Sequence, residues 1–196
     1  GLIVRTGNGG RSWEPASSPV LLGSLYDVAA RGSANSGGTW VAVGDAGFDA
    51  AIYRSSDGGS SWSAPSAPSG VLLRGVVWAG SRWVAVGSDF LGMQGRIYTS
   101  ADGGSWTAST LPGAGTLPLL DVASDGSGVV IAVGEGGEVL RSEDGGLSFS
   151  RIAPTLRGGV DLTAITAEAS GSFVFGGGES LLVRISGTVV TELVPA

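Results

Sequence analysis

The sequence of 196 residues lacks cysteine and histidine altogether, and its eleven basic residues are all arginine. Without cysteine, the chain can form no disulfide, no thiolate nucleophile and no cysteine-ligated zinc site. Without histidine, it lacks the usual general base near neutral pH and the commonest metal ligand. Among the common catalytic groups, these absences leave carboxylates as candidates. We assign no catalytic residue and expect no cofactor and no metal.

Long apolar runs and positive charge are also scarce. No window of about 18 consecutive apolar residues occurs, so the sequence predicts no membrane insertion. Seventeen acidic residues against eleven arginines give a net charge of -6, which repels phosphate backbones and predicts no nucleic acid partner. The chain begins at Gly1 without a signal-peptide pattern, which indicates a processed mature form or an excised fragment.

The residues that are abundant predict a folded, turn-rich domain. Thirty-six glycines accompany 42% hydrophobic residues and six tryptophans, a composition that favours a packed core over a disordered linker. The length suits one good-sized domain, so we expect residues 1–196 to form a single unit.

A short motif recurs along the chain. Its four copies begin at residues 6, 55, 100 and 142, which are 49, 45 and 42 residues apart, and a worn fifth copy spans residues 184–190. A period in the forties is typical of propeller or solenoid repeats. The four copies read Thr6-Gly-Asn-Gly-Gly-Arg-Ser-Trp13, Ser55-Ser-Asp-Gly-Gly-Ser-Ser-Trp62, Ser100-Ala-Asp-Gly-Gly-Ser-Trp106 and Ser142-Glu-Asp-Gly-Gly-Leu-Ser-Phe149.

Two further elements keep step with this motif and predict strands. One reads Trp40-Val-Ala-Val-Gly44 and Trp83-Val-Ala-Val-Gly87, and the other, upstream of each, begins at Leu25 or Leu73. Both are short and β-branched or aromatic, and both are bounded by Gly, Ser, Pro and Asp. We therefore expect an all-β fold, a β-propeller of four-stranded antiparallel blades whose strands a, b, c and d follow in chain order.

The predicted strands do not fill a whole number of blades. We place blades at approximately 1–19, 20–66, 67–111, 112–154 and 155–196, about five in all, the first holding only strands c and d. Three arrangements stay open: a five-bladed ring with an incomplete blade, a four-bladed ring in which residues 2–13 pair with residues 162–177, and part of a larger ring or assembly. Open strand edges invite pairing, so self-association through the incomplete blade is also a candidate.

The recurring motif predicts a braced reverse turn between strands c and d. Paired glycines supply positive φ values, and the aspartate can accept hydrogen bonds from nearby backbone N–H groups. The motif resembles the Asp box of the BNR repeat family, in which the boxes lie on the propeller face away from the site. A structural role is expected for Asn8, Asp57, Asp102, Asp144, Trp13, Trp62, Trp106 and Phe149.

A second set of carboxylates recurs in the loops between strands b and c. If the strand order is that of a propeller, these loops share one face, and their acidic groups could hold a cation, receive a basic partner or bind sugar hydroxyls. The alternative is that they are merely solvated loop tips of an acidic protein. The candidate binding residues are Asp45, Asp49, Asp89, Glu135, Glu138 and Glu179.

The carboxylates do not form a recognisable catalytic set. The Asp-box resemblance suggests sialidases, but their arginine triad and Arg-Ile-Pro motif are absent. Asp27 and Asp121 could imitate the two aspartates of a xyloglucanase-like propeller, yet they are equivalent by repeat, whereas catalysis needs two unlike environments. The chain is most similar to non-catalytic bacterial BNR proteins, including those similar to the photosystem II assembly factor.

The resemblance implies a rigid, non-catalytic binding or scaffold module that presents one face to a protein or glycan partner. We expect the protein to lie outside the cell or in the periplasm. Two alternatives stay open. The chain could be a fragment of an Asp-box glycoside hydrolase, or a structural subunit of a bacterial surface assembly.

Overall fold

The computed structural model describes residues 2–19, 23–32, 37–113, 115–152, 159–187 and 189–193. The blade boundaries expected near 20, 154–155 and 196, and Thr188 of the worn fifth motif, lie outside the described residues. In these ranges the chain is built from five antiparallel sheets, each made of strands consecutive in sequence. The prediction of an all-β fold with antiparallel blades is confirmed.

The sheets have two, three, four, four and four strands. The first holds β1 (Val4–Arg5) and β2 (Glu14–Pro15), and the second β3 (Ser24–Arg31), β4 (Thr39–Ala46) and β5 (Asp49–Ser55). The third holds β6 (Val71–Trp78), β7 (Trp83–Asp89), β8 (Gly95–Ser100) and β9 (Thr107–Ala108). The fourth holds β10 (Leu119–Ser124), β11 (Val130–Gly134), β12 (Val139–Ser142) and β13 (Ser150–Arg151), and the fifth β14 (Leu162–Ala167), β15 (Phe173–Gly177), β16 (Leu182–Ser186) and β17 (Val189–Glu192).

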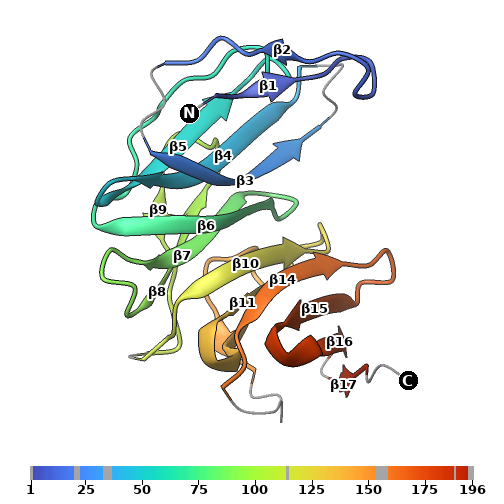
Figure 1. Cartoon of the computed structure of the whole chain (residues 1–196). Helices are drawn as coiled ribbons and strands as arrows, with labels where there is room; N and C mark the ends of the chain where they lie inside the picture. The colour runs from blue at the N-terminus through green and yellow to red at the C-terminus, as the bar shows by residue number, and fades with distance from the viewer. Residues whose placement is uncertain are drawn as a thin grey trace.

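The five sheets follow one another along an open arc, with the two chain ends at opposite extremes (Figure 1). Strands β14 to β17 form one sheet, and β1 pairs only with β2 among the described strands. The four-bladed closure, in which residues 2–13 join residues 162–177, is therefore not what the structure shows.

Apolar side chains of neighbouring sheets interlock to form the core. One cluster joins Val41 and Val43 of β4 to Leu73 and Val76 of β6. A second lies between the sheets β6–β9 and β10–β13, and a third between β10–β13 and β14–β17. Burial on both faces explains why strand b of each blade is a nearly continuous apolar run rather than an alternating one.

A glycine near the end of each strand b is required by a close backbone approach. Strand a carries an irregularity in register just after its first leucine, as between Leu25 and Asp27 in β3. This brings a strand-a carbonyl against the glycine: a Cβ on Gly44 would lie 1.8 Å from the oxygen of Ser24, and one on Gly87 would lie 1.9 Å from that of Leu72. The recurring Val-Ala-Val-Gly pattern therefore reflects packing of strand b against strand a.

The second blade differs from the expectation of four strands. Its strand d, expected from Trp62 onward, is reduced to one bridge in which Arg54 and Ser63 exchange backbone hydrogen bonds of 2.9 and 2.8 Å. Pro65 follows two residues later and has no N–H to donate, so the ladder stops there.

Candidate functional site

Each Asp box folds the turn between strands c and d onto its own side chains. In residues 55–62, Asp57 Oδ1 accepts hydrogen bonds from the N–H groups of Ser60 (3.0 Å) and Ser61 (2.9 Å) and from the Ser55 hydroxyl (2.8 Å). The Ser55 oxygen accepts the N–H of Gly59 (2.9 Å), whose φ of 85° favours glycine. Asn8, Asp102 and Asp144 accept corresponding backbone bonds in the other three boxes.

These hydrogen bonds lower the pKa of each box aspartate to about 2. For Asp57 the largest cause is the hydrogen bond from the Ser61 hydroxyl, and for Asp102 it is a backbone N–H of its own turn. For Asp144, burial acts to raise the pKa, but hydrogen bonds led by the one from the Ser148 hydroxyl outweigh it. The three carboxylates are thus ionised near neutral pH, with their oxygens engaged in bracing the turn.

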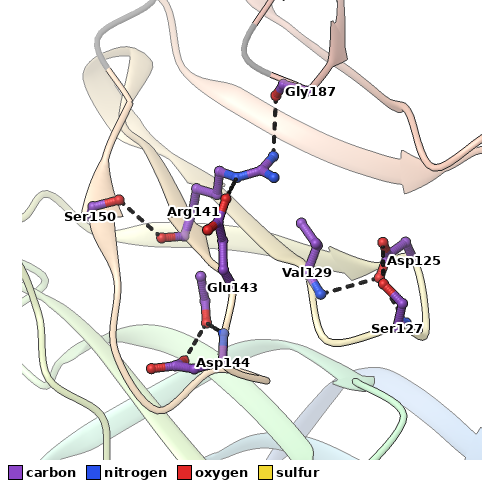
Figure 2. A network of polar contacts seen from close by, with 9 residues as sticks. Asp125, Ser127, Val129, Arg141, Glu143, Asp144, Ser150 and Gly187 are labelled. Carbon is purple, nitrogen blue, oxygen red and sulfur yellow. Dashed lines mark hydrogen bonds and ion pairs between the residues drawn. The ribbon is translucent and has the colours of Figure 1, made fainter.

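Arginines tie the box turns of neighbouring sheets together. In three sheets, the arginine at one repeat position donates a hydrogen bond to the box turn of a following sheet: Arg5 to Ser60 Oγ, Arg54 Nε to the carbonyl of Asp102 (2.7 Å), and Arg141 Nη1 to the carbonyl of Gly187 (3.2 Å). Figure 2 shows the Arg141 guanidinium reaching Gly187 while its Nε pairs with Glu143 at 3.1 Å. On the face that carries the boxes, these arginine hydrogen bonds therefore link neighbouring sheets.

The carboxylate oxygens of Asp27 and Asp121 also accept hydrogen bonds from backbone N–H groups. Asp27 accepts the N–H of Val28 (2.7 Å) in its own strand and that of Val76 (2.8 Å) in the next sheet. Asp121 does the same with Val122 and Ile165, both at 2.8 Å. Burial, the largest influence, raises the pKa of Asp121. Two carboxylates with the same partners are a repeated brace between strands a, not an acid and a base with different tasks.

The acidic residues of the b–c loops fall into two groups, of which the first is engaged in bonds within the fold. Asp49 Oδ1 accepts the N–H of Gly70 (2.9 Å), and Asp89 Oδ1 accepts that of Met93 (2.9 Å). Glu138 is buried and pairs with Arg151 Nε at 2.7 Å, which raises the pKa of the arginine.

The second group is exposed or only lightly engaged. Asp45 Oδ2 accepts a hydrogen bond from the hydroxyl of Tyr26. Glu135 and Glu179 are exposed in two 3-10 turns, η2 (Glu135–Gly137) and η3 (Gly178–Ser180). Across the described residues no three acidic side chains gather as metal ligands would.

Exposed apolar side chains stand at the tips of two adjacent b–c loops. The two-residue turn between β4 and β5 presents Phe48, and the loop between β7 and β8 presents Phe90, Leu91 and Met93, all exposed. The rings of Phe48 and Phe90 meet edge to face with centroids 4.6 Å apart. We name these four side chains the loop patch. Soluble proteins seldom expose such a cluster unless it contacts a partner.

The loop patch borders a hollow with both apolar and charged lining residues. A cavity of about 410 Å³ is lined by residues of four sheets, including Gly92, Tyr26, Arg74 and Glu135. The Arg74 guanidinium stacks over the Tyr26 ring, 4.2 Å from its centroid, and the Tyr26 hydroxyl donates to Asp45. The b–c face thus combines apolar contacts with an arginine and carboxylates of opposite sign.

The solved structures that are similar to this chain include two of YCF48 and one of a GH74 enzyme. YCF48 bound to D1 peptide matches 84% of this chain and 50% of its own, with 18% identity and a TM-score of 0.62. YCF48 from Cyanidioschyzon merolae matches 97% and 63%, with 16% identity and a TM-score of 0.64. An ancestral GH74 enzyme matches 97% and 28%, with 17% identity and a TM-score of 0.75. The fold is a β-propeller.

This chain spans less than two thirds of the length of each of these propellers. At such low identity the likeness shows the propeller fold and no activity. Scans of protein-family models and of curated protein sequences found no significant match. Within the described part of the propeller, no helix has the length and apolar character to cross a membrane.

The loop patch is the part of the propeller's b–c face that the carboxylate pattern did not reveal. Its signal was in the sequence: Phe48 lies between Gly47 and Asp49, and Phe90-Leu91 follows Asp89, where a loop tip is expected to be polar. Apolar residues at turn positions cannot enter the core of the blade that carries them, so they mark a surface.

Proposed function

We propose that this protein is a non-catalytic binding module whose b–c face contacts a polypeptide partner through the loop patch and the neighbouring hollow. The observation that carries the proposal is the exposed edge-to-face pair of Phe48 and Phe90, which joins two blades into one apolar surface. Aromatic side chains and methionine are enriched at protein interfaces, and anchors of this kind dominate binding energy.

The surroundings of the loop patch favour a partner that is both apolar and basic. Asp45 and Glu135 lie on the same face, and the net charge of -6 attracts cations. One of the similar YCF48 structures is described as bound to a D1 peptide, so a propeller of this kind can bind a peptide. A stiff arc of interlocked blades also keeps the face preorganised, which reduces the entropic cost of binding.

We also infer that the chain is a member of the BNR repeat family. Four boxes at blade spacing, each on a turn between strands c and d, support this membership. A location outside the cell or in the periplasm, and a bacterial source, are proposals that accompany it.

The test uses an array of synthetic peptides that vary in net charge and apolar content. We expect the protein to select basic peptides that contain apolar residues. The double variant Phe48→Ser/Phe90→Ser should bind these peptides with an affinity at least about tenfold lower. Leu147→Ser is the matched control, because Leu147 is exposed in a box turn. Both variants should melt like the parent. No peptide bound, or equal binding by both variants, would contradict the proposal.

Two rival functions have a direct assay each. A glycoside hydrolase is favoured only by the likeness to GH74 enzymes, and turnover of xyloglucan or sialosides would establish it. A self-associating structural subunit is favoured by the open first blade, and light scattering that shows only monomer at micromolar concentration would remove it.

A further inference from the structure

The hollow on the b–c face is lined by one irregularity from each strand a. In β3, β6, β10 and β14, one residue just after a leucine is skipped in the pairing with strand b. A β-bulge of this kind re-aims the side chain of the extra residue. All four bulge residues line the hollow, and they are Tyr26, Arg74, Leu120 and Thr163.

The bulge position changes in chemistry from sheet to sheet, whereas the positions around it repeat. The residue before it is leucine in all four strands, and the second residue after it is valine or isoleucine. Core packing explains the leucines, because Leu73, Leu119 and Leu162 are all fully buried. The bulge residues instead supply an aromatic ring, a guanidinium, an aliphatic chain and a hydroxyl. Unlike groups gathered at one hollow are suited to recognising a ligand.

The charges at the hollow disfavour a ligand group of either sign. The Arg74 guanidinium stacks on the Tyr26 ring and donates to no acceptor within the described residues, so it repels a cation. Asp45 accepts the hydrogen bond of the Tyr26 hydroxyl, and Glu135 lines the hollow, so an anion is repelled as well. A neutral group within an otherwise basic peptide meets neither repulsion.

An aromatic side chain is the neutral group that gains most at this position. The negative face of its ring is attracted by a guanidinium, as the contact between Arg74 and Tyr26 already illustrates. A guanidinium is planar, so it can stack on a second ring through its other face. Pro118 and Leu120 add apolar wall, and the cavity of about 410 Å³ has room for one side chain.

We propose that the hollow is an anchor site for one aromatic side chain of the polypeptide partner, which stacks against the Arg74 guanidinium. This inference rests on the proposed function, because the peptide that carries the ring is the one that the loop patch binds. The two surfaces are continuous, since Gly92 lines the hollow and lies between Leu91 and Met93 of the loop patch. The loop patch supplies apolar area, and the bulge residues select the ring.

The probe is a synthetic peptide of alternating leucine and lysine with one variable central position. That position carries phenylalanine in one version and cyclohexylalanine in the other, which has a similar size and apolar character but no aromatic face. We expect the parent protein to bind the phenylalanine version at least about fivefold more tightly. In Arg74→Gln the two versions should bind with equal affinity. Isothermal titration calorimetry measures both affinities.

Arg31→Gln is the matched control variant. Arg31 also stacks on an aromatic ring, with Cζ 4.6 Å from the centroid of Trp78, but it lies at the opposite end of β3 from Tyr26. This variant loses the same charge and should keep the preference for phenylalanine. Thermal unfolding shows whether each variant is folded, and the comparison of the two peptides on the parent protein needs no variant at all.

Equal binding of the two versions by the parent protein would overturn this inference and leave the proposed function standing. So would a preference that persists in Arg74→Gln, or one that is lost in Arg31→Gln. Tighter binding of a version with glutamate or lysine at the variable position would also overturn it, because the hollow would then be a site for an ion. If no version binds the parent protein, the proposed function falls together with the inference.

Discussion

The box of residues 6–13 and the box of residues 55–62 make the same turn in different surroundings. In the first, Asn8 Oδ1 accepts the N–H of Ser12 at 3.0 Å and Thr6 Oγ1 accepts that of Gly10 at 2.9 Å. In the second, the corresponding bonds to Asp57 and Ser55 both measure 2.9 Å. Asparagine replaces aspartate and threonine replaces serine, yet the turn closes alike.

The final tryptophans of these two boxes differ completely. Trp62 is 8% exposed and donates its indole N–H to the carbonyl of Gly59 at 3.1 Å, whereas Trp13 is 60% exposed. The conformation of the turn is therefore determined by its own eight residues. Burial of the tryptophan ring is instead determined by strands that are distant in sequence. The comparison separates what a box does locally from what a complete blade adds.

The largest expected effect comes from removing the two tryptophans. Trp62→Ala empties a packed site between sheets and should lower the free energy of unfolding by about 3 to 5 kcal/mol. For a chain of this size that corresponds to a fall in Tm on the order of 10 °C. Trp13→Ala should cost less than about 1 kcal/mol, because its ring is largely in water. Thermal and urea unfolding measure both, and equal losses would remove the distinction between the two boxes.

A smaller effect is expected from removing the brace of the turn. Asp57→Ala leaves the N–H groups of Ser60 and Ser61 without their acceptor and should lower the free energy of unfolding by about 1 to 2 kcal/mol. Asn8→Ala breaks the same bonds at the end of the arc, where the turn can fray without opening a complete blade, and should have less effect. Urea unfolding of the two variants gives the comparison. A larger loss for Asn8→Ala would mean that β1 and β2 stabilise the whole chain.

The periodic features of the fold were predictable because they arise from short segments. The Val-Ala-Val-Gly strands and the boxes each contain the residues that dictate their conformation. The shortened strand d after Trp62 was not foreseen, although Pro65 was there to end it. Closure of the arc depends on how distant sheets meet, and no local pattern carries that information.

The candidate binding residues were harder to predict because a loop carboxylate has two possible uses. A loop aspartate can face solvent or cap its own loop, and the sequence pattern is the same for both. Asp49 and Asp89 accept backbone hydrogen bonds, whereas Glu135 is exposed and lines the hollow. Apolar loop tips are less ambiguous, because no local hydrogen bond explains Phe48 or Leu91. Their exposure is a better guide to the b–c face than the acidic pattern.

The smallest expected effect concerns acid, and it sharpens the comparison of aspartate with asparagine in the two boxes. The pKa of Asp57 is lowered to about 2 in the folded chain, chiefly by the hydrogen bond from the Ser61 hydroxyl. In the unfolded chain the Asp57 carboxylate binds a proton more readily than in the folded chain. The ionised carboxylate therefore stabilises the folded state fully above the ordinary carboxyl pKa of about 4, and this stabilisation is lost as the pH falls through about 2.

Asp57→Asn should keep the turn at neutral pH, as Asn8 does in its own box, and should make the loss of stability between pH 4 and 2 less steep. Because the side chain is largely exposed to solvent, the difference is expected to be a fraction of that for Asp57→Ala. Urea midpoints of parent and variant at pH 5 and at pH 2.5 measure it. An unchanged pH slope would show that the charge of the box contributes nothing beyond the oxygen that accepts the backbone bonds.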